Sequence, residues 1–458
     1  MVTNLWRQYA ASESLKHKVA LRDHSQGDVF TWCQLAEKID EIAFRLQQES
    51  QTGSGIALYG KNSLQLLCHY LAALQLNMRV LGINSAFTAE KAEQLCRLND
   101  IDLCVSFVQD KPTYKKQSQN RPHFLSQGLT MTLTSGSSGA PKAVVHNIEA
   151  HLANARGVCD LLQFTAQDAW LLSLPLYHVS GQGIVWRWLL QGAELHLPHQ
   201  DFYSSVIRAS HISLVPTQLQ RLLAYLQQND IRDYETRHIL LGGAQIPTEL
   251  TRRLQSYRIQ SYCGYGMTEM ASTVFAKCSD EKSGVGQPLL GREYCLSDDE
   301  IWLRGAGLGL GYWHDGRILP FVNEQGWFQT RDKGYWLDNE LVIAGRLDNM
   351  FISGGENIQP EEIERLICDS GWVEQAFVLP CEDTEFGQRP VAMVKFKQDF
   401  SLDAVNKLQN WLSDKIEKFK QPIRYFPLET EKWQQGAIKI SRALLQAELN
   451  KILGIKSV

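Results

Sequence analysis

The chain has 458 residues, of which 44% are hydrophobic and 21% are charged. These fractions are typical of globular proteins, and the length favours two or three domains at roughly 150 residues each. The net charge is −4 and no apolar run reaches the length of a membrane span, which argues against nucleic acid and membrane insertion. The ten cysteines lack CxxC spacing and the N-terminus lacks a signal-peptide core, so we expect a reduced, cytoplasmic enzyme.

Residues 1–127 predict alternating helices and short strands. Apolar residues recur at helical spacing over 31–48, a short apolar run at 53–60 is typical of a strand, and 63–84 predicts a buried helix that enters a strand. This alternation indicates a doubly wound α/β layer without a catalytic motif of its own. The polar, turn-rich stretch 111–128 is expected to be an exposed connector.

The stretch from Thr130 to His146 has the pattern of a strand, a tight loop and a second strand. Backbone N–H groups at glycines can approach anionic oxygens, hydroxyls can donate to them and a lysine adds positive charge, so the loop suits a triphosphate. The Walker pattern is absent because the lysine follows a proline, and a polar hairpin turn is the alternative. The residues expected to bind phosphate are Thr134, Ser135, Gly136, Ser137, Ser138, Gly139 and Lys142.

A buried arginine is predicted further along the chain. We expect a helix from Glu149 to Leu162, a buried strand from Asp168 to His178, and then a helix that is apolar nearly all round. Arg187 lies in the middle of that second helix. Because a buried guanidinium needs an anionic partner, Arg187 is expected to receive a ligand carboxylate or a structural Asp or Glu. A side chain whose charged end reaches the surface is the third alternative.

Three predicted strands then end in small or hydroxyl residues, at Ser213, at 242–245 and at 264–269. Ligands of α/β proteins bind at strand carboxyl ends. The glycines at 242–243 leave room for a flat ring, and Tyr265 can stack on a base. Thr268 can donate to a phosphate and Glu269 can hold Mg²⁺. Tight turns would equally explain the glycines, and Glu269 would also suit the start of a helix.

From Gly284 the sequence is rich in glycine and short β-type runs, which predicts a β-barrel-like subdomain over about 284–345. Asp332 is suited to accept both hydroxyls of a ribose, and Arg346 lies near it; ordinary turn residues are the alternative. A helix and an apolar strand after residue 351 predict a separate small α+β domain. The expected organisation is therefore an N-terminal domain at 1–345, a hinge at 346–350 and a C-terminal domain at 351–458.

Together, and in this order, the motifs closely resemble the adenylate-forming superfamily of acyl-CoA synthetases, luciferases and peptide-synthetase adenylation domains. The corresponding stretches are TSGSSGAPK (134–142, phosphate loop), GYGMTE (264–269, adenine and magnesium), TRD (330–332, ribose), GRLDNM (345–350, hinge) and QGAIKIS (435–441, catalytic lysine). Two departures are visible. Arg331 replaces the usual glycine, and Ala437 and Ile438 replace the usual Ser/Thr-Gly before Lys439.

The resemblance implies a ligase that uses ATP, Mg²⁺ and coenzyme A and has a mobile C-terminal domain. It implies that Lys439 bridges the acid and the α-phosphate, that Glu269 holds Mg²⁺ and that the chain pivots at Asp348. The other residues expected to bind ATP are Gly243, Ala244, Gln245, Tyr265, Gly266, Asp332 and Arg346. Those expected to be catalytic are Lys439, Glu269, Thr268 and His178. The residues expected to bind coenzyme A are Gly354, Gly355 and Glu356.

Within this superfamily, the stretches 171–193, 213–223 and 240–247 are similar to the o-succinylbenzoyl-CoA synthetases of menaquinone biosynthesis. Their substrate has two carboxylates, so the similarity implies that Arg187, assisted by Ser213, receives the aryl carboxylate. Gly264 and His178 are expected to line the acyl pocket, with a core histidine as the alternative for His178.

The expected reaction joins o-succinylbenzoate to coenzyme A through an acyl-adenylate and releases AMP and pyrophosphate. The alternatives are another aryl- or acyl-CoA ligase, a carrier-loading enzyme, and a non-catalytic nucleotide-binding relative. A homo-oligomer is compatible with the sequence, whereas binding to nucleic acid and insertion into a membrane are not expected.

Overall fold

The computed structural model describes residues 4–50, 54–117, 127–134, 141–243, 246–430 and 440–454. The chain forms two compact units. The first comprises Met1–Gly136, Pro141–Tyr294 and Leu303–Phe328, and the second comprises Ser137–Ala140, Cys295–Trp302 and Gln329–Val458. The predicted α/β class is confirmed by the succession of helices and strands. The predicted hinge at 346–350 falls inside the second unit, and the domain boundaries stay predictions.

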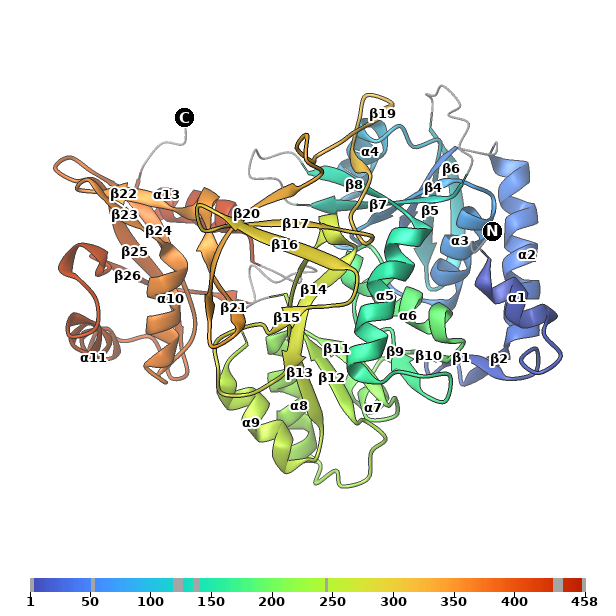
Figure 1. Cartoon of the computed structure of the whole chain (residues 1–458), viewed down its shortest axis with the longest axis horizontal. Coiled ribbons are helices and arrows are strands. Elements are labelled where there is room, and N and C mark those ends of the chain that lie inside the picture. Colours follow the sequence, from blue (N-terminus) through green and yellow to red (C-terminus); the bar gives the residue numbers. More distant parts are fainter. Residues whose placement is uncertain are drawn as a thin grey trace. The chain divides into compact units, whose positions relative to one another are not determined.

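A nine-stranded sheet of the first unit contains the strands that were predicted to bind ligand (Figure 1). In spatial order its strands are β15 (Gln287–Pro288), β14 (Ser272–Cys278), β13 (Gln260–Met267), β12 (His238–Leu241), β11 (His211–Leu214), β9 (Ala169–Leu171), β10 (Glu194–Leu197), β1 (Val19–Asp23) and β2 (Asp28–Thr31). The strands from β13 to β1 run parallel to their neighbours. This arrangement confirms the predicted doubly wound layer.

Helices pack on both faces of that sheet. They are α5 (Ile148–Leu162), α6 (Val179–Gln191), α7 (Phe202–Val206), α8 (Pro216–Gln228) and α9 (Thr248–Ser256). Leucines of α8 and α9 pack against Ile212 and Leu214 of β11. Because successive side chains of a strand point to opposite faces, Ser213 points away from α8, and it meets Arg187 of α6 on the other face.

A second, eight-stranded sheet contains the strands on either side of the predicted phosphate loop. Its strands in spatial order are β19 (Arg317–Leu319), β18 (Gly311–His314), β8 (Lys142–Asn147), β7 (Leu129–Thr134), β4 (Arg79–Ile83), β3 (Gly55–Tyr59), β5 (Leu103–Val108) and β6 (Lys111–Lys116). The helices before and within this part are α1 (Leu5–Ala11), α2 (Trp32–Glu49), α3 (Leu64–Gln75) and α4 (Ala89–Leu98). A capping box at Thr31 starts α2, as the helical pattern predicted.

Two predictions for single elements were wrong. Residues 111–116 form β6, which pairs antiparallel with β5, so this part of the expected connector is a strand. The strand expected from Asp168 to His178 is only Ala169–Leu171. It ends early because the chain bends after Leu171, and Pro175 has no N–H to donate to a ladder.

The β-rich segment 284–345 does not form one barrel-like subdomain. Strands β16 (Arg292–Ser297), β17 (Glu300–Gly305), β20 (Phe328–Leu337) and β21 (Glu340–Arg346) make an open four-stranded sheet. β15 instead extends the nine-stranded sheet, and β18 pairs with β8 of the eight-stranded sheet. The prediction of one subdomain failed because β15 and β18 leave the segment to cover the edges of β14 and β8 in the two larger sheets.

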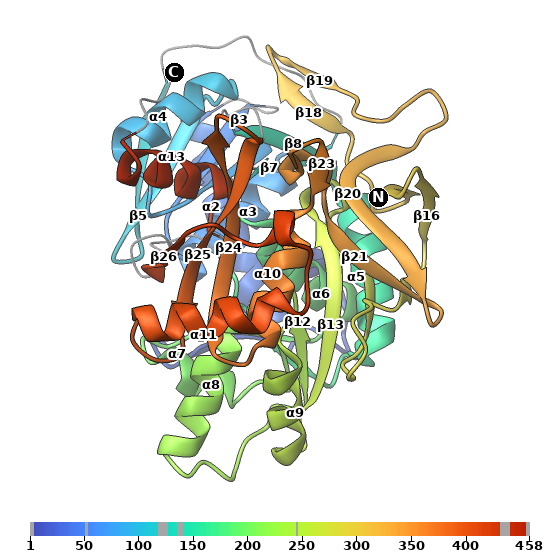
Figure 2. The same cartoon turned by 90° about the vertical axis from the view of Figure 1, so that its left-hand side faces the viewer.

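The C-terminal part of the second unit is a small sheet with helices on both faces (Figure 2). Its elements are η2 (Leu347–Asn349), β22 (Phe351–Ser353), β23 (Glu356–Ile358), α10 (Pro360–Asp369), β24 (Val373–Asp383), β25 (Gly387–Phe396), α11 (Leu402–Ser413), η3 (Lys418–Lys420), β26 (Tyr425–Pro427) and α13 (Arg442–Ile452). Val378 of β24 packs with α10 and α11, whereas its neighbour Leu379 packs with α13. This alternation along β24 explains how one strand serves two cores.

In the described ranges, no helix is both long enough and apolar enough to cross a membrane. All ten cysteines carry unbridged thiols.

Candidate active site

The carboxyl ends of three parallel strands bring several predicted residues to one edge of the nine-stranded sheet. Leu214 of β11 is paired with Leu241 of β12, which is paired with Cys263 of β13. Gly243 follows β12 with a φ of 88°, a left-handed conformation that favours glycine. Ala244 and Gln245 lie outside the described residues. The edge is therefore assembled as the strand-end argument predicted.

Close packing against β14 requires Gly266 and leaves little room at Gly264. A Cβ added to Gly266 would lie 2.1 Å from the carbonyl oxygen of Ser272, and one added to Gly264 would lie 3.1 Å from Thr273 Cγ2. The ladder shifts register between Tyr265 and Gly266. Tyr265 lies beside Phe275, with 6.3 Å between the ring centroids.

Glu269 is held at both its backbone and its side chain. It lies with Thr268 in η1 (Thr268–Met270), a three-residue 3₁₀ turn that does not start an α-helix. The N–H of Gly309 donates to the carbonyl oxygen of Glu269 at 2.8 Å, and the hydroxyl of Tyr312 donates to Glu269 Oε1 at 2.9 Å. The helix-start alternative for this carboxylate therefore does not apply.

Glu269 suits Mg²⁺ only together with ATP. Across the described part of the chain, no three His, Cys, Asp or Glu side chains gather in a way that could hold a metal ion. Mg²⁺ in nucleotide sites is commonly held by one or two carboxylates, with phosphate oxygens and water completing its shell. A single fixed carboxylate fits that chemistry.

The predicted phosphate loop is bounded as the sequence indicated. Thr134 ends β7 and is paired with Lys142, which begins β8. The Thr134 hydroxyl donates to the Lys142 carbonyl oxygen at 3.3 Å. The exposed Lys142 ammonium lies 5.2 Å from the centroid of the Tyr312 ring. Ser135, Gly136, Ser137, Ser138 and Gly139 lie outside the described residues.

The guanidinium of Arg187 is buried among hydroxyl and aromatic groups, with no carboxylate of the described residues paired to it. Its side chain is 1% exposed, and its Nη1 and Nη2 each lie 3.5 Å from a hydroxyl, those of Ser213 and Ser272. Trp170 packs against the guanidinium, 4.9 Å from ring centroid to Cζ. Among the described residues, no Asp or Glu forms an ion pair with Arg187, and its Nε has no acceptor. Burial lowers the pKa of Arg187 to about 10.

Two of the alternatives for Arg187, a charged end in solvent and a structural carboxylate, are not found among the described residues. The side chain does not reach solvent, and the described carboxylates do not neutralise it. A buried cation without a protein anion favours a ligand anion. His178, the other residue predicted for the acyl pocket, is a half-buried residue that precedes α6, and its ring lies 4.8 Å from that of Tyr177.

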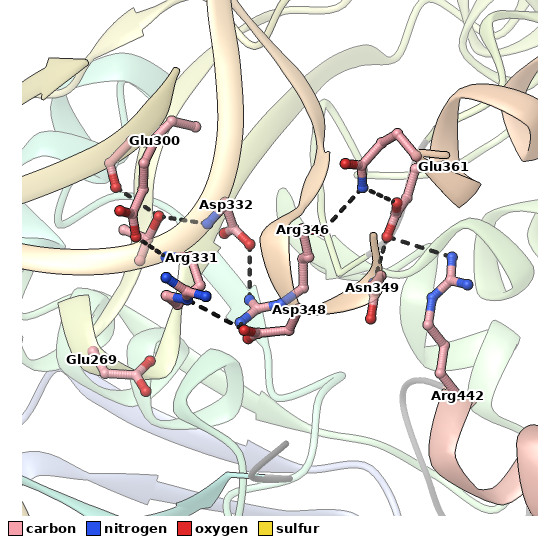
Figure 3. A network of polar contacts seen from close by, with 12 residues as sticks. Glu269, Glu300, Arg331, Asp332, Arg346, Asp348, Asn349, Glu361 and Arg442 are labelled. Atoms are coloured by element: carbon pink, nitrogen blue, oxygen red, sulfur yellow. Dashed lines mark hydrogen bonds and ion pairs between the residues drawn. The ribbon is translucent and has the colours of Figure 1, made fainter. Parts of the chain in front are cut away.

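The predicted ribose and hinge residues form one polar network in the second unit (Figure 3). Arg346 Nη1 donates to Asp332 Oδ1 at 2.8 Å, and Arg346 Nη2 donates to Asp348 Oδ2 at 3.2 Å. Arg331 Nε donates to Asp348 Oδ1 at 3.2 Å. Asp348, the predicted hinge residue, thus accepts hydrogen bonds from two guanidinium groups in this conformation.

Arg331 adopts a φ of 64°, which explains the glycine that is usual at this position in the resembling family. Its backbone N–H donates to Glu300 Oε1 at 2.9 Å, which, with the Asp348 contact, stabilises the strained conformation. Gly354 and Gly355 also have positive φ values, 60° and 90°, and form the turn between β22 and β23 that leads into Glu356. Lys439 lies outside the described residues.

Sequence reasoning missed three residues that contact the predicted ones: Trp170, Ser272 and Tyr312. No local pattern marks Ser272, which reaches Arg187 from a backbone with a φ of 127°. Tyr312 was visible only as part of a glycine-rich β-type run. Trp170 was missed because its sequence context is that of an ordinary aromatic residue in a buried strand.

The chain belongs to the family described as AMP-binding enzyme, whose pattern matches residues 8–313. It is 57% identical over 452 residues to the 2-succinylbenzoate--CoA ligase of Haemophilus influenzae, covering 97% of this chain and 98% of that one.

Solved structures give the same family likeness. An Arg-to-Lys variant of Escherichia coli MenE with bound OSB-AMS is 39% identical, superposes with a TM-score of 0.85, and the match covers 98% of each chain. The o-succinylbenzoate coenzyme A synthetase (MenE) of Bacillus subtilis in complex with ATP and magnesium ion has a TM-score of 0.80 at 23% identity, over 93% of this chain and 96% of that chain. The latter supports the fold.

Proposed function

We propose that this chain joins o-succinylbenzoate to coenzyme A at the expense of ATP, forming o-succinylbenzoyl-CoA, AMP and pyrophosphate. The product belongs to menaquinone biosynthesis. The observation that carries the choice of acid is the buried guanidinium of Arg187, which has no carboxylate partner among the described residues. The 57% identical ligase and the E. coli MenE bound to OSB-AMS support the same acid.

In the first half-reaction, the aliphatic carboxylate attacks the α-phosphorus of ATP and pyrophosphate leaves. A carboxylate that approaches a polyanion needs neutralised charge more than proton transfer. Lys439 bridges the charges of the nucleophile and the α-phosphate in this proposal, and the residues from Thr134 to Lys142 bind the leaving phosphates. Glu269 would hold Mg²⁺, and the bound ion would neutralise phosphate charge.

In the second half-reaction, the thiol of coenzyme A displaces AMP from the acyl-adenylate. Lys439 is not needed once the adenylate exists. The chain turns at Asp348, removes Lys439 and presents Gly354, Gly355 and Glu356 to the coenzyme. A Cβ at Gly354 would lie 2.8 Å from the Phe386 ring, so this turn disfavours a larger residue there.

Acid recognition is assigned to other residues than the attack on ATP. Arg187 receives the aryl carboxylate, with Ser213 and Ser272 holding the guanidinium from two sides. Gly264 and His178 line the rest of the acyl pocket. Tyr265, Gly266, Gly243, Ala244 and Gln245 surround the adenine, and Asp332 and Arg346 bind the ribose. We also propose that the enzyme is cytoplasmic, and a homo-oligomer is compatible with this proposal.

The test is an assay with o-succinylbenzoate, ATP, Mg²⁺ and coenzyme A, in which AMP, pyrophosphate and the thioester are measured. We expect the three products in equal amounts. The control acid is 4-oxo-4-phenylbutanoate, which keeps the aliphatic carboxylate and lacks the aryl one; we expect a kcat/KM about 100-fold lower, because the buried arginine stays unpaired. Equal use of both acids would favour another acyl-CoA ligase. No AMP with any acid would favour a non-catalytic relative.

A further inference from the structure

Tyr312 connects two residues that serve different parts of ATP in the proposed function. Its hydroxyl donates to Glu269 Oε1 at 2.9 Å, and its ring centroid lies 5.2 Å from the ammonium of Lys142. All three residues belong to the first unit. We propose that Tyr312 is a positioning residue for ATP: it orients the carboxylate that meets Mg²⁺ and supports the lysine of the phosphate loop. This inference rests on the proposed function.

The position of Tyr312 is fixed by strand pairing. β18 runs antiparallel to β8, and the register places Tyr312 opposite Val144, two residues from Lys142. The N–H of Leu310 donates to the carbonyl oxygen of Val145 at 2.8 Å and extends this ladder. Phe321 packs against the Tyr312 ring, with 5.0 Å between centroids. The ring therefore has little freedom to move relative to the strand that begins at Lys142.

The same segment also fixes the backbone of Glu269. The Gly309 N–H donates to the Glu269 carbonyl oxygen at 2.8 Å. A side chain at 309 would be crowded, because its Cβ would lie 3.0 Å from the Val145 carbonyl oxygen and 3.1 Å from His146 Nε2. Gly309 and Tyr312 thus hold the backbone and the carboxylate of one residue from one short stretch of chain.

This arrangement gives Tyr312 two separable effects. A hydroxyl that donates to a carboxylate stabilises the charged form and restricts its rotation, both of which favour binding of a cation. An aromatic face near an ammonium attracts the cation without neutralising it, so Lys142 keeps its charge for phosphate. The hydroxyl should govern the metal-dependent part of ATP binding, and the ring should govern the metal-independent part.

The experiment measures dissociation constants for ATP by titration calorimetry, once with Mg²⁺ and once with EDTA, on the full chain and without the acid. For Tyr312→Phe we expect the tightening caused by Mg²⁺ to fall about tenfold, with binding in EDTA unchanged. For Tyr312→Leu we expect the same loss and, in addition, about two- to fivefold weaker binding in EDTA. Tyr335→Phe is the matched control, because Tyr335 is 44% exposed and lies on β20, and it should change neither value.

A double-mutant cycle guards against a general structural defect. If Tyr312 acts through Glu269, Tyr312→Phe should have no further effect on the Mg²⁺ increment in a Glu269→Gln background. The KM for o-succinylbenzoate should stay within about twofold of that of the unmodified protein. An unchanged Mg²⁺ increment in Tyr312→Phe, or an equal loss in both backgrounds, would overturn the inference. Because the titration needs no acid, this outcome is distinct from failure of the proposed reaction, which would appear as no thioester from the unmodified protein.

Discussion

In the proposed function, the choice of acid depends on Arg187. It is fully buried, two hydroxyls and a tryptophan ring surround it, and burial lowers its pKa to about 10, so it stays cationic at neutral pH. Arg187→Ala should raise the KM for o-succinylbenzoate about 100-fold and leave the KM for ATP within about twofold, because only the acid loses its partner. Steady-state kinetics with each substrate varied in turn provide the measurement.

The control for Arg187 is both chemical and structural. With 4-oxo-4-phenylbutanoate, which has no aryl carboxylate, Arg187→Ala and the unmodified protein should give similar kcat/KM values. Arg221→Ala, at an exposed arginine of α8, should leave both acids unaffected. A similar loss for both acids, accompanied by a lower midpoint of thermal unfolding, would mean that Arg187 supports the fold and does not select the acid.

At the scale of residues, the sequence predicted the charged groups better than their surroundings. Arg187 was visible because an arginine within an apolar helix violates the usual pattern of burial. Ser272 was not, because it reaches Arg187 through a positive φ and a shifted ladder that no local pattern encodes. For Arg331, the resemblance supplied the information that glycine is usual, and the φ of 64° supplies the reason.

At the scale of elements, prediction succeeded where the information was local. The helical spacing of apolar residues over 31–48 predicted α2, and the glycine and serine run after β7 marks the end of that strand. Prediction failed for β6 and for the β-rich segment 284–345, whose strands separate into three sheets. Which edge a strand covers depends on chains far away in sequence, and a periodicity of two does not encode the partner.

Two helices of the second unit are joined by a partly buried ion pair. Arg442 at the start of α13 donates through Nη2 to Glu364 of α10 at 2.6 Å, and the Val378 N–H donates to the same carboxylate oxygen at 2.6 Å. Burial raises the pKa of Glu364 to about 7, and Arg442 opposes the rise. The folded state thus binds the Glu364 proton more tightly than the unfolded state. The associated stability is present at pH values below the ordinary pKa of a glutamate and is lost as pH rises through about 7, the pKa of Glu364 in the folded state.

Arg442→Met should therefore destabilise the protein in a pH-dependent way. Without the guanidinium, the pKa of Glu364 rises further and ionising it becomes harder, so the free energy of unfolding should fall by about 3 kcal/mol at pH 8 and by much less at pH 5. Urea denaturation at both pH values measures this. Lys395→Met, which breaks the more exposed pair with Glu374, should cost under about 1 kcal/mol at both. A loss for Arg442→Met that does not depend on pH would contradict the assignment.

At the scale of the whole molecule, the residues predicted to take part in the reaction are divided between the two units. Glu269, Lys142 and Arg187 belong to the first, and Asp332 and Asp348 belong to the second. The order of motifs along the sequence predicted a two-part ligase, and the family membership confirms the class. The proposed reaction needs the two parts to act in turn. The Arg331 and Arg346 contacts on Asp348 would have to rearrange in a turn at this residue.

The proposed scheme is tested most directly by measuring the two half-reactions separately in a Lys439 variant. If Lys439 serves only the attack on the α-phosphate, Lys439→Ala should lower pyrophosphate release at least about 100-fold, because the developing charge loses its counter-ion. The same variant should still convert supplied o-succinylbenzoyl-AMP and coenzyme A to thioester at a rate within about threefold of the unmodified protein, since the adenylate is already formed. Lys451→Ala, at a 77% exposed lysine of α13, should alter neither rate. An equal loss of both half-reactions in Lys439→Ala would show that one arrangement of the chain serves both steps, and the proposed turn at Asp348 would then have no role.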